Sequence, residues 1–143
     1  MSMPKLGNLV PYLYYADIEA MIDWYSRVFG FVEKDRWRAP DGSIQNAEMH
    51  VGDTELWMDG DPAPGIHDLT ASSDGSPRPL WIGVWLESPS AVDALHDHIV
   101  SQGVEPTERP HDRPFGIRTF NVTDPEGYIW GFMCRTPRSN ASS

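Results

Sequence analysis

Three side chains able to move protons or hold a metal lie close together in the first half of the chain: Glu48, His50 and Glu55. Glu48 and His50 alternate along one predicted strand, and Glu55 begins the next strand after a turn at Gly52 and Asp53, so a hairpin can bring all three to one face. Two carboxylates and an imidazole can act as acid and base or bind a divalent metal such as Zn, Ni, Mn or Fe. These are the candidate catalytic residues; the alternative is that they are solvated residues of an exposed strand face.

Aromatic side chains share this predicted face. Successive strand residues point to opposite sides, and the side without aliphatic residues gathers tyrosines and tryptophans. Indole and phenol rings attract cations by about 0.5–2 kcal/mol each, and carboxylates complement the same charge. The predicted ligand-binding residues of this surface are Tyr12, Tyr14, Glu48, Trp57, Trp81 and Trp85. The alternative interpretation is that the indoles are core residues.

Further candidates follow in the second half of the chain. His111 and Phe115 fall in a predicted loop, and Arg118 lies on the strand after it. Arg118 is the cation that could hold an anionic group of a ligand, and its alternative role is a surface salt bridge. The run from Asp124 to Gly127 has the composition of a structural turn, and Cys134 has no base partner that would make it reactive.

The elements that must position these residues follow one order twice. The first half predicts a strand over 9–15, a helix capped by Asp17 and ended by Gly30, and strands over 31–38, 44–51 and 54–58. The second half predicts a strand over 80–86, a helix from Ser88 to Gly103, and strands over 104–109, 117–122 and 129–134. We therefore expect an α+β chain of a single domain, 1–143, made of two βαβββ modules at 8–60 and 80–136. A linker over 61–79 and a disordered C-terminal tail complete it.

Composition excludes several classes of protein. The 143 residues are 40% hydrophobic and carry a formal net charge of −10, which suits a folded chain and disfavours nucleic acid and anionic membranes as partners. The sequence has no apolar stretch long enough to span a membrane and no signal peptide, so we expect a cytoplasmic protein. One cysteine excludes an internal disulfide and a zinc site built from cysteines.

Several motifs, in order along nearly the whole chain, carry a resemblance to a known family. They are Val10-Pro11-Tyr12-Leu13-Tyr14-Tyr15 before Asp17, Trp24-Tyr25 through Phe29-Gly30-Phe31, Ala47-Glu48-Met49 before Gly52-Asp53, Arg113-Pro114-Phe115-Gly116, and Asp124-Pro125-Glu126-Gly127-Tyr128. The chain resembles the glyoxalase-like branch of the vicinal oxygen chelate superfamily, which includes bleomycin resistance proteins and extradiol dioxygenases. The resemblance implies a cupped mixed sheet with helices on its outer face, and a homodimer.

The resemblance also implies where a metal would bind. Metal-dependent members place ligands on the first and fourth strand of each module, and these positions fall on Val10, Trp57 or Glu55, Trp81 and Gly131. Because almost none of them can ligate, we expect no cofactor and no metal. The leading hypothesis is metal-free binding and sequestration of a small molecule, a drug or metabolite that is planar and can be cationic. The alternative is a lyase, isomerase or dioxygenase-type enzyme with an atypical metal or acid/base site at Glu48, His50 and Glu55.

Overall fold

The structure is a computed structural model that describes residues 3–60 and 80–137. The predicted linker and C-terminal tail lie outside the described residues. The chain divides into two compact units. Unit 1 holds the residues up to Ser26 and those from Gly30 to the end of the first half, and unit 2 holds Arg27–Phe29 with the second half. We describe each unit by itself.

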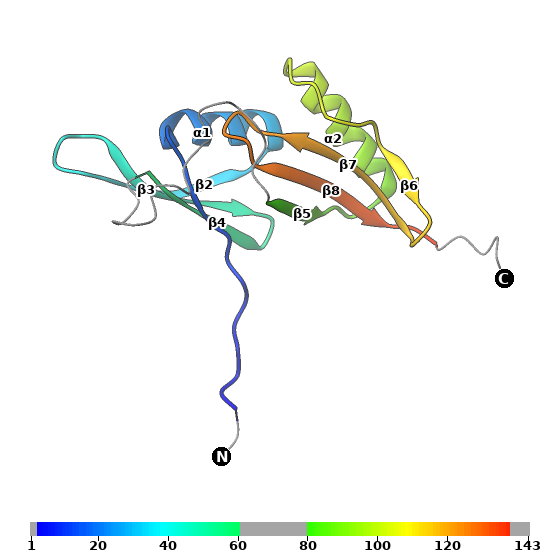
Figure 1. The fold of residues 1–143 in the computed structure, drawn as a ribbon, viewed down its shortest axis with the longest axis horizontal. Coiled ribbons are helices and arrows are strands. Elements are labelled where there is room, and N and C mark those ends of the chain that lie inside the picture. Colours follow the sequence, from blue (N-terminus) through cyan, green and yellow to red (C-terminus); the bar gives the residue numbers. More distant parts are fainter. Residues whose placement is uncertain (1–2, 61–79, 138–143) are drawn as a thin grey trace. The chain divides into compact units, whose positions relative to one another are not determined.

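Unit 1 contains a four-stranded mixed sheet in the order β1-β4-β3-β2 (Figure 1). The strands are β1 (Tyr12–Tyr14), β2 (Val32–Arg38), β3 (Ile44–Val51) and β4 (Thr54–Asp59). β1 runs parallel to β4, and the other pairs are antiparallel. One face of the sheet is buried, with Leu13, Ala47, Met49, Leu56 and Met58 at 6% exposure or less.

The helix of the first half begins and ends where the sequence predicts. The Asp17 carboxylate accepts a hydrogen bond from the backbone N–H of Ala20 at 3.0 Å, which caps α1 (Ile18–Trp24). The helix continues as a π-helical turn, η1 (Tyr25–Phe29), and ends at Gly30, whose φ of 76° is the left-handed conformation that glycine adopts without strain.

Unit 2 repeats this arrangement in the order β5-β8-β7-β6. Its elements are β5 (Trp81–Trp85), α2 (Pro89–Ser101), β6 (His111–Arg113), β7 (Ile117–Thr123) and β8 (Ile129–Arg135). The Ser88 hydroxyl caps α2 by accepting from the N–H of Ala91 at 3.1 Å, and α2 packs on β7 and β8. Neither helix in the described ranges has the length and apolar character that a membrane span requires.

The turn between β7 and β8 is structural, as predicted. Asp124 is 4% exposed, and its Oδ1 accepts from the N–H groups of Glu126 at 2.9 Å and Tyr128 at 3.0 Å. Its Oδ2 accepts from Nε1 of the buried Trp130 at 2.9 Å. One buried carboxylate therefore accepts hydrogen bonds from three donors and holds the turn in place. Cys134 is buried, and its Sγ donates to the Arg135 carbonyl.

Two predicted strands need correction. β1 is shorter than 9–15, and Leu9 is 94% exposed, because pairing with β4 begins only at the Pro11 carbonyl. The predicted strand at 104–109 is wrong, and β6 lies at His111–Arg113 instead. Pro106 and Pro110 have no N–H for a ladder, so this segment bonds to β7 only through Thr107.

Candidate functional site

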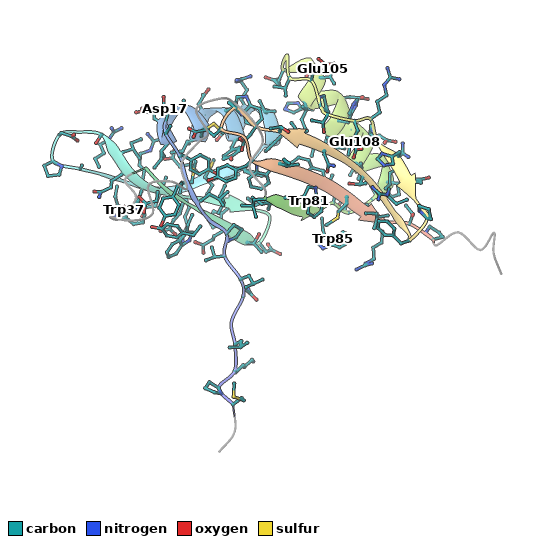
Figure 2. The ribbon with its side chains drawn as sticks, in the orientation of Figure 1. Asp17, Trp37, Trp81, Trp85, Glu105 and Glu108 are labelled. Carbon is teal, nitrogen blue, oxygen red and sulfur yellow. The ribbon has the colours of Figure 1, made fainter. Side chains whose placement is uncertain are left out.

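The exposed face of the unit 2 sheet carries two indoles. Along β5, Ile82 and Val84 are half-buried on the side of α2, whereas Trp81 and Trp85 are 47% and 51% exposed on the other side. Figure 2 shows both indoles projecting from β5 away from α2. The predicted division of this strand into two faces is therefore confirmed.

Trp81 is held against the sheet by glycines. A Cβ atom added at Gly83 would lie 2.8 Å from the Trp81 ring, and one added at Gly131 would lie closer still. Real Cβ atoms almost never approach a neighbour so closely, so the ring occupies space that only glycine leaves open. Trp81 Nε1 donates to Asn121 Oδ1 on β7 at 2.9 Å, which fixes the orientation of the ring.

A hollow of about 420 Å³ lies over these rings, and we call it the indole groove. Its lining residues are Trp81, Trp85, Arg113, Phe115, Ile117, Thr119, Asn121, Met133 and Arg135. Two guanidinium groups lie on aromatic rings there: Cζ of Arg135 is 4.7 Å from the Trp85 ring centroid, and Cζ of Arg113 is 5.1 Å from that of Phe115. The groove therefore combines apolar ring faces with cationic groups.

One polar atom of the groove lining has no hydrogen-bond partner. Thr119 is 4% exposed, and its Oγ1 bonds to no atom in the described part of the chain. Thr119 shares one side of β7 with Ile117 and Asn121, while Phe120 and Val122 lie in the core on the other side. Buried hydroxyl groups nearly always have a partner, so this one can still bond to a group outside the described residues.

The exposed face of unit 1 has a different chemistry, and we call it the acidic face: Tyr12, Trp37, Glu48, Trp57 and Asp59. The rings of Tyr12 and Trp57 lie 6.0 Å apart beside a hollow of about 390 Å³ that Trp37 and Glu48 also line. Tyr12 Oη donates to Asp59 Oδ2 at 2.8 Å. Burial, followed by this bond, raises the pKa of Tyr12 to about 12, so Tyr12 is a neutral donor at ordinary pH.

The candidate catalytic residues meet a lysine that the sequence analysis missed. Lys34 Nζ donates to Glu48 Oε1 at 3.2 Å and to Glu55 Oε1 at 3.0 Å, and His50 lies opposite Glu55 in the β3–β4 register. Hydrogen bonds from Trp57 and then from Lys34 lower the pKa of Glu55, which makes it a poor proton donor at neutral pH. The two carboxylates raise the pKa of Lys34.

The remaining candidates do not all come together. Tyr14 lies beside Tyr12, with ring centroids 5.7 Å apart, and Phe115 lines the indole groove. His111 lies on β6, where its Nδ1 contacts the Arg109 carbonyl at 3.0 Å, and it is not part of the groove lining.

Arg118 does not belong to the lining of the indole groove. Its guanidinium bonds to Asp93 on α2 at 2.9 Å and to Asp112 at 3.0 Å, so it makes the salt bridges that were its alternative role. Trp57 and Trp81 belong to different units.

The residues do not fit the divalent metal that the family resemblance implies. The positions assigned to ligands carry Val10, Trp57 or Glu55, Trp81 and Gly131, of which only Glu55 offers a carboxylate, and the Trp81 ring fills the space above Gly131. At the alternative set, the Lys34 ammonium already lies between Glu48 and Glu55. Across residues 3–60 and 80–137, no three histidine, cysteine or carboxylate side chains form a group able to hold a metal.

Comparisons with known proteins agree with the fold. The model of a family described as the Glyoxalase/Bleomycin resistance protein/Dioxygenase superfamily matches residues 5–132. The crystal structure of TioX from Micromonospora sp. ML1 is 29% identical with a TM-score of 0.71, covering 90% of this chain and 98% of that one. A glyoxalase/bleomycin resistance protein/dioxygenase from Nocardioides is 22% identical with a TM-score of 0.70, covering 100% of this chain and 91% of that one.

The chain is also similar to an uncharacterized protein of Mycobacterium tuberculosis (strain ATCC 25618 / H37Rv). It is 27% identical over 125 residues, which cover 85% of this chain and 71% of that protein. Together with the two four-stranded mixed sheets and two helices, these matches confirm the predicted α+β fold class.

Proposed function

We propose that this chain, which belongs to the Glyoxalase/Bleomycin resistance protein/Dioxygenase superfamily, binds a small planar aromatic molecule without transforming it. The observation that carries the proposal is the indole groove, where Trp81 and Trp85 offer half-exposed ring faces on a rigid sheet. Concave apolar sites with a few placed polar groups are the usual form of a small-molecule site. Sequestration of a drug or metabolite is the function that such binding would serve.

The size of the groove supports a ligand of two or three fused rings. A volume of about 420 Å³ lies within the range of typical ligand sites. Stacking on an aromatic side chain contributes about 1–3 kcal/mol per ring by alanine substitution in other systems. Because β8 supports Trp81 and Asn121 holds its Nε1, the ring loses little freedom when a ligand binds.

The proposal is tested by titrating the protein with a panel of planar aromatic molecules while following tryptophan fluorescence and heat. We expect saturable binding in the wild type and a 5- to 100-fold weaker affinity in Trp85→Ala. Trp37→Ala is the matched control, since Trp37 is 47% exposed, close to the 51% of Trp85, but lies in unit 1. An equal loss of affinity in both variants, or the absence of saturable binding by every molecule of the panel, would contradict the proposal.

The enzyme alternative makes a different forecast. Near-stoichiometric Zn, Ni, Mn or Fe in protein purified without chelator would favour it, as would turnover that depends on Glu48 or His50. The Lys34 bridge between Glu48 and Glu55 argues against a metal at that position.

The proposal includes a homodimer, which the family resemblance implies. The exposed apolar side chains of the N-terminal segment, Leu6 at 84% and Leu9 at 94%, support association with a second copy. Sedimentation velocity at micromolar concentration tests it, and a mass near 16.1 kDa would exclude the dimer under those conditions.

A further inference from the structure

We infer that the ligand of the indole groove carries an anionic group, such as a carboxylate, beside its aromatic ring. This inference rests on the proposed function and names the ligand class more closely. The groove lining contains Arg113 and Arg135 and no aspartate or glutamate. The sign of charge is therefore opposite to the cationic ligand that the sequence analysis favoured.

The two arginines of the groove differ from the paired arginines elsewhere in the chain. Arg36 pairs with Glu33 and Glu19, and Arg118 pairs with Asp93 and Asp112. Within the described ranges, neither Arg113 nor Arg135 has a carboxylate within ion-pair distance; each lies instead on an aromatic ring. A guanidinium on a ring face keeps its N–H edge available, and that edge matches the two oxygens of a carboxylate.

Two further donors belong to the same lining. Because Asn121 Oδ1 accepts from Trp81 Nε1, the amide nitrogen of Asn121 remains as a donor. Thr119 Oγ1, which lacks a partner among the described residues, can donate to an anionic oxygen. Hydrogen-bond donors from β6, β7 and β8 thus line one hollow together with the aromatic rings. An aromatic carboxylate fits the donors through its oxygens and the rings through its own ring.

The experiment compares three probes that share one ring system: 2-naphthoate, 2-naphthamide and 2-naphthylmethylammonium. Calorimetric titration at low salt should give a dissociation constant for 2-naphthoate at least tenfold lower than for the amide, and weakest binding for the ammonium. Equal affinities would overturn the inference while leaving the proposed function intact. Absence of saturation by all three would overturn the proposed function and the inference together.

Variants connect the charge preference to the named residues. Arg135→Met and Arg113→Met should each lower the affinity for 2-naphthoate by about tenfold and change the affinity for 2-naphthamide by less than threefold. Arg38→Met in unit 1 is the control and should change neither affinity. Thr119→Val keeps the shape of the side chain and removes a buried hydroxyl without a partner, so folding should be preserved while 2-naphthoate binding weakens severalfold. Unchanged 2-naphthoate affinity in all three groove variants would overturn the inference, with circular dichroism confirming that each variant is folded.

Discussion

The two sheets of this protein share one strand order, yet the charged groups that line the hollows beside their exposed rings differ: a carboxylate in unit 1 and arginines in unit 2. In unit 1, Tyr12 and Trp57 lie among the carboxylates of Glu48 and Asp59. In unit 2, the rings lie under arginines, and the groove lining has no carboxylate. The repeat of the fold determines which way a side chain points and leaves its chemistry to the sequence. Two modules with the same fold can therefore present surfaces that suit different ligands.

The indoles of the two faces also come from strands at different places in the module. Trp57 lies on β4 between the buried Leu56 and Met58, and the matching position of β8, between Trp130 and Phe132, is Gly131. In unit 2 the ring above that position comes from Trp81 on β5. The unit 2 arrangement thus needs glycine where unit 1 has tryptophan.

The largest effect should separate core indoles from face indoles. Trp130 is 1% exposed and bonded to Asp124, so Trp130→Ala should lower the free energy of unfolding by about 3–5 kcal/mol. Trp57→Ala and Trp81→Ala remove rings that are 38% and 47% exposed and should cost only about 1–2 kcal/mol each. Urea denaturation measures all three. A loss for Trp81→Ala as large as that for Trp130→Ala would mean that Trp81 is a core residue.

Gly131→Ala should disturb the Trp81 ring. The new Cβ meets the indole, so the ring must move, and overpacking of this kind costs about 1–3 kcal/mol. The tryptophan emission should shift to the red as Trp81 gains contact with water. Gly7→Ala is the control, because a Cβ at Gly7 has no atom within 4 Å. If Gly131→Ala matched Gly7→Ala in stability and emission, the described position of Trp81 would be wrong.

Lys34→Met should lower the free energy of unfolding by an amount that depends on pH. The pKa of Glu55 is lowered from 4.5, so its contribution to stability is present above pH 4.5 and is lost as the pH falls through the lowered value. The pKa of Lys34 is raised from 10.5, so its contribution is present below pH 10.5 and is lost as the pH rises through the raised value. The difference in free energy of unfolding between Lys34→Met and the wild type should be largest between these two pH limits and should disappear in acid. Lys5→Met is the control, and a difference independent of pH would contradict the bridge.

The smallest effect concerns Tyr12. Ultraviolet titration should show one tyrosine with a pKa of about 12 that is absent from Tyr12→Phe. Asp59→Asn should lower that value toward 10, because the bond to Asp59 favours the neutral phenol. Since the folded pKa is above the unfolded one, the stability from this bond is present below pH 10 and is lost as the pH rises to about 12. If the pKa of Tyr12 had its ordinary value, the hydrogen bond from Tyr12 to Asp59 would be contradicted.

Local signals predicted much of the fold. Helix caps at Asp17 and Ser88 depend on one side chain and its neighbours in sequence, and both are present. Strand alternation placed Trp81 and Trp85 on the exposed face because burial of Ile82 and Val84 leaves them no other side. The predicted strand at 104–109 is wrong because Pro106 within it and Pro110 directly after it have no N–H groups for strand pairing.

The site was less accessible to sequence analysis. Lys34 approaches Glu48 and Glu55 where the β2–β3 register shifts between Glu33 and Asp35, and no sequence pattern marks that irregularity. Arg118 could not be assigned to a side because its partner, Asp93, is on another element. The unpartnered Thr119 hydroxyl is a property of tertiary packing, which one strand cannot predict.

β2 is the last strand in the order of its sheet and leaves backbone N–H and C=O groups along one edge. Unprotected edges of this kind recruit strands from other molecules and begin aggregation. Here five of the seven residues of β2 are charged, and the register shift interrupts its regularity. Concentrated protein should therefore resist fibril growth along this edge, and neutralising those charges should make the chain prone to it.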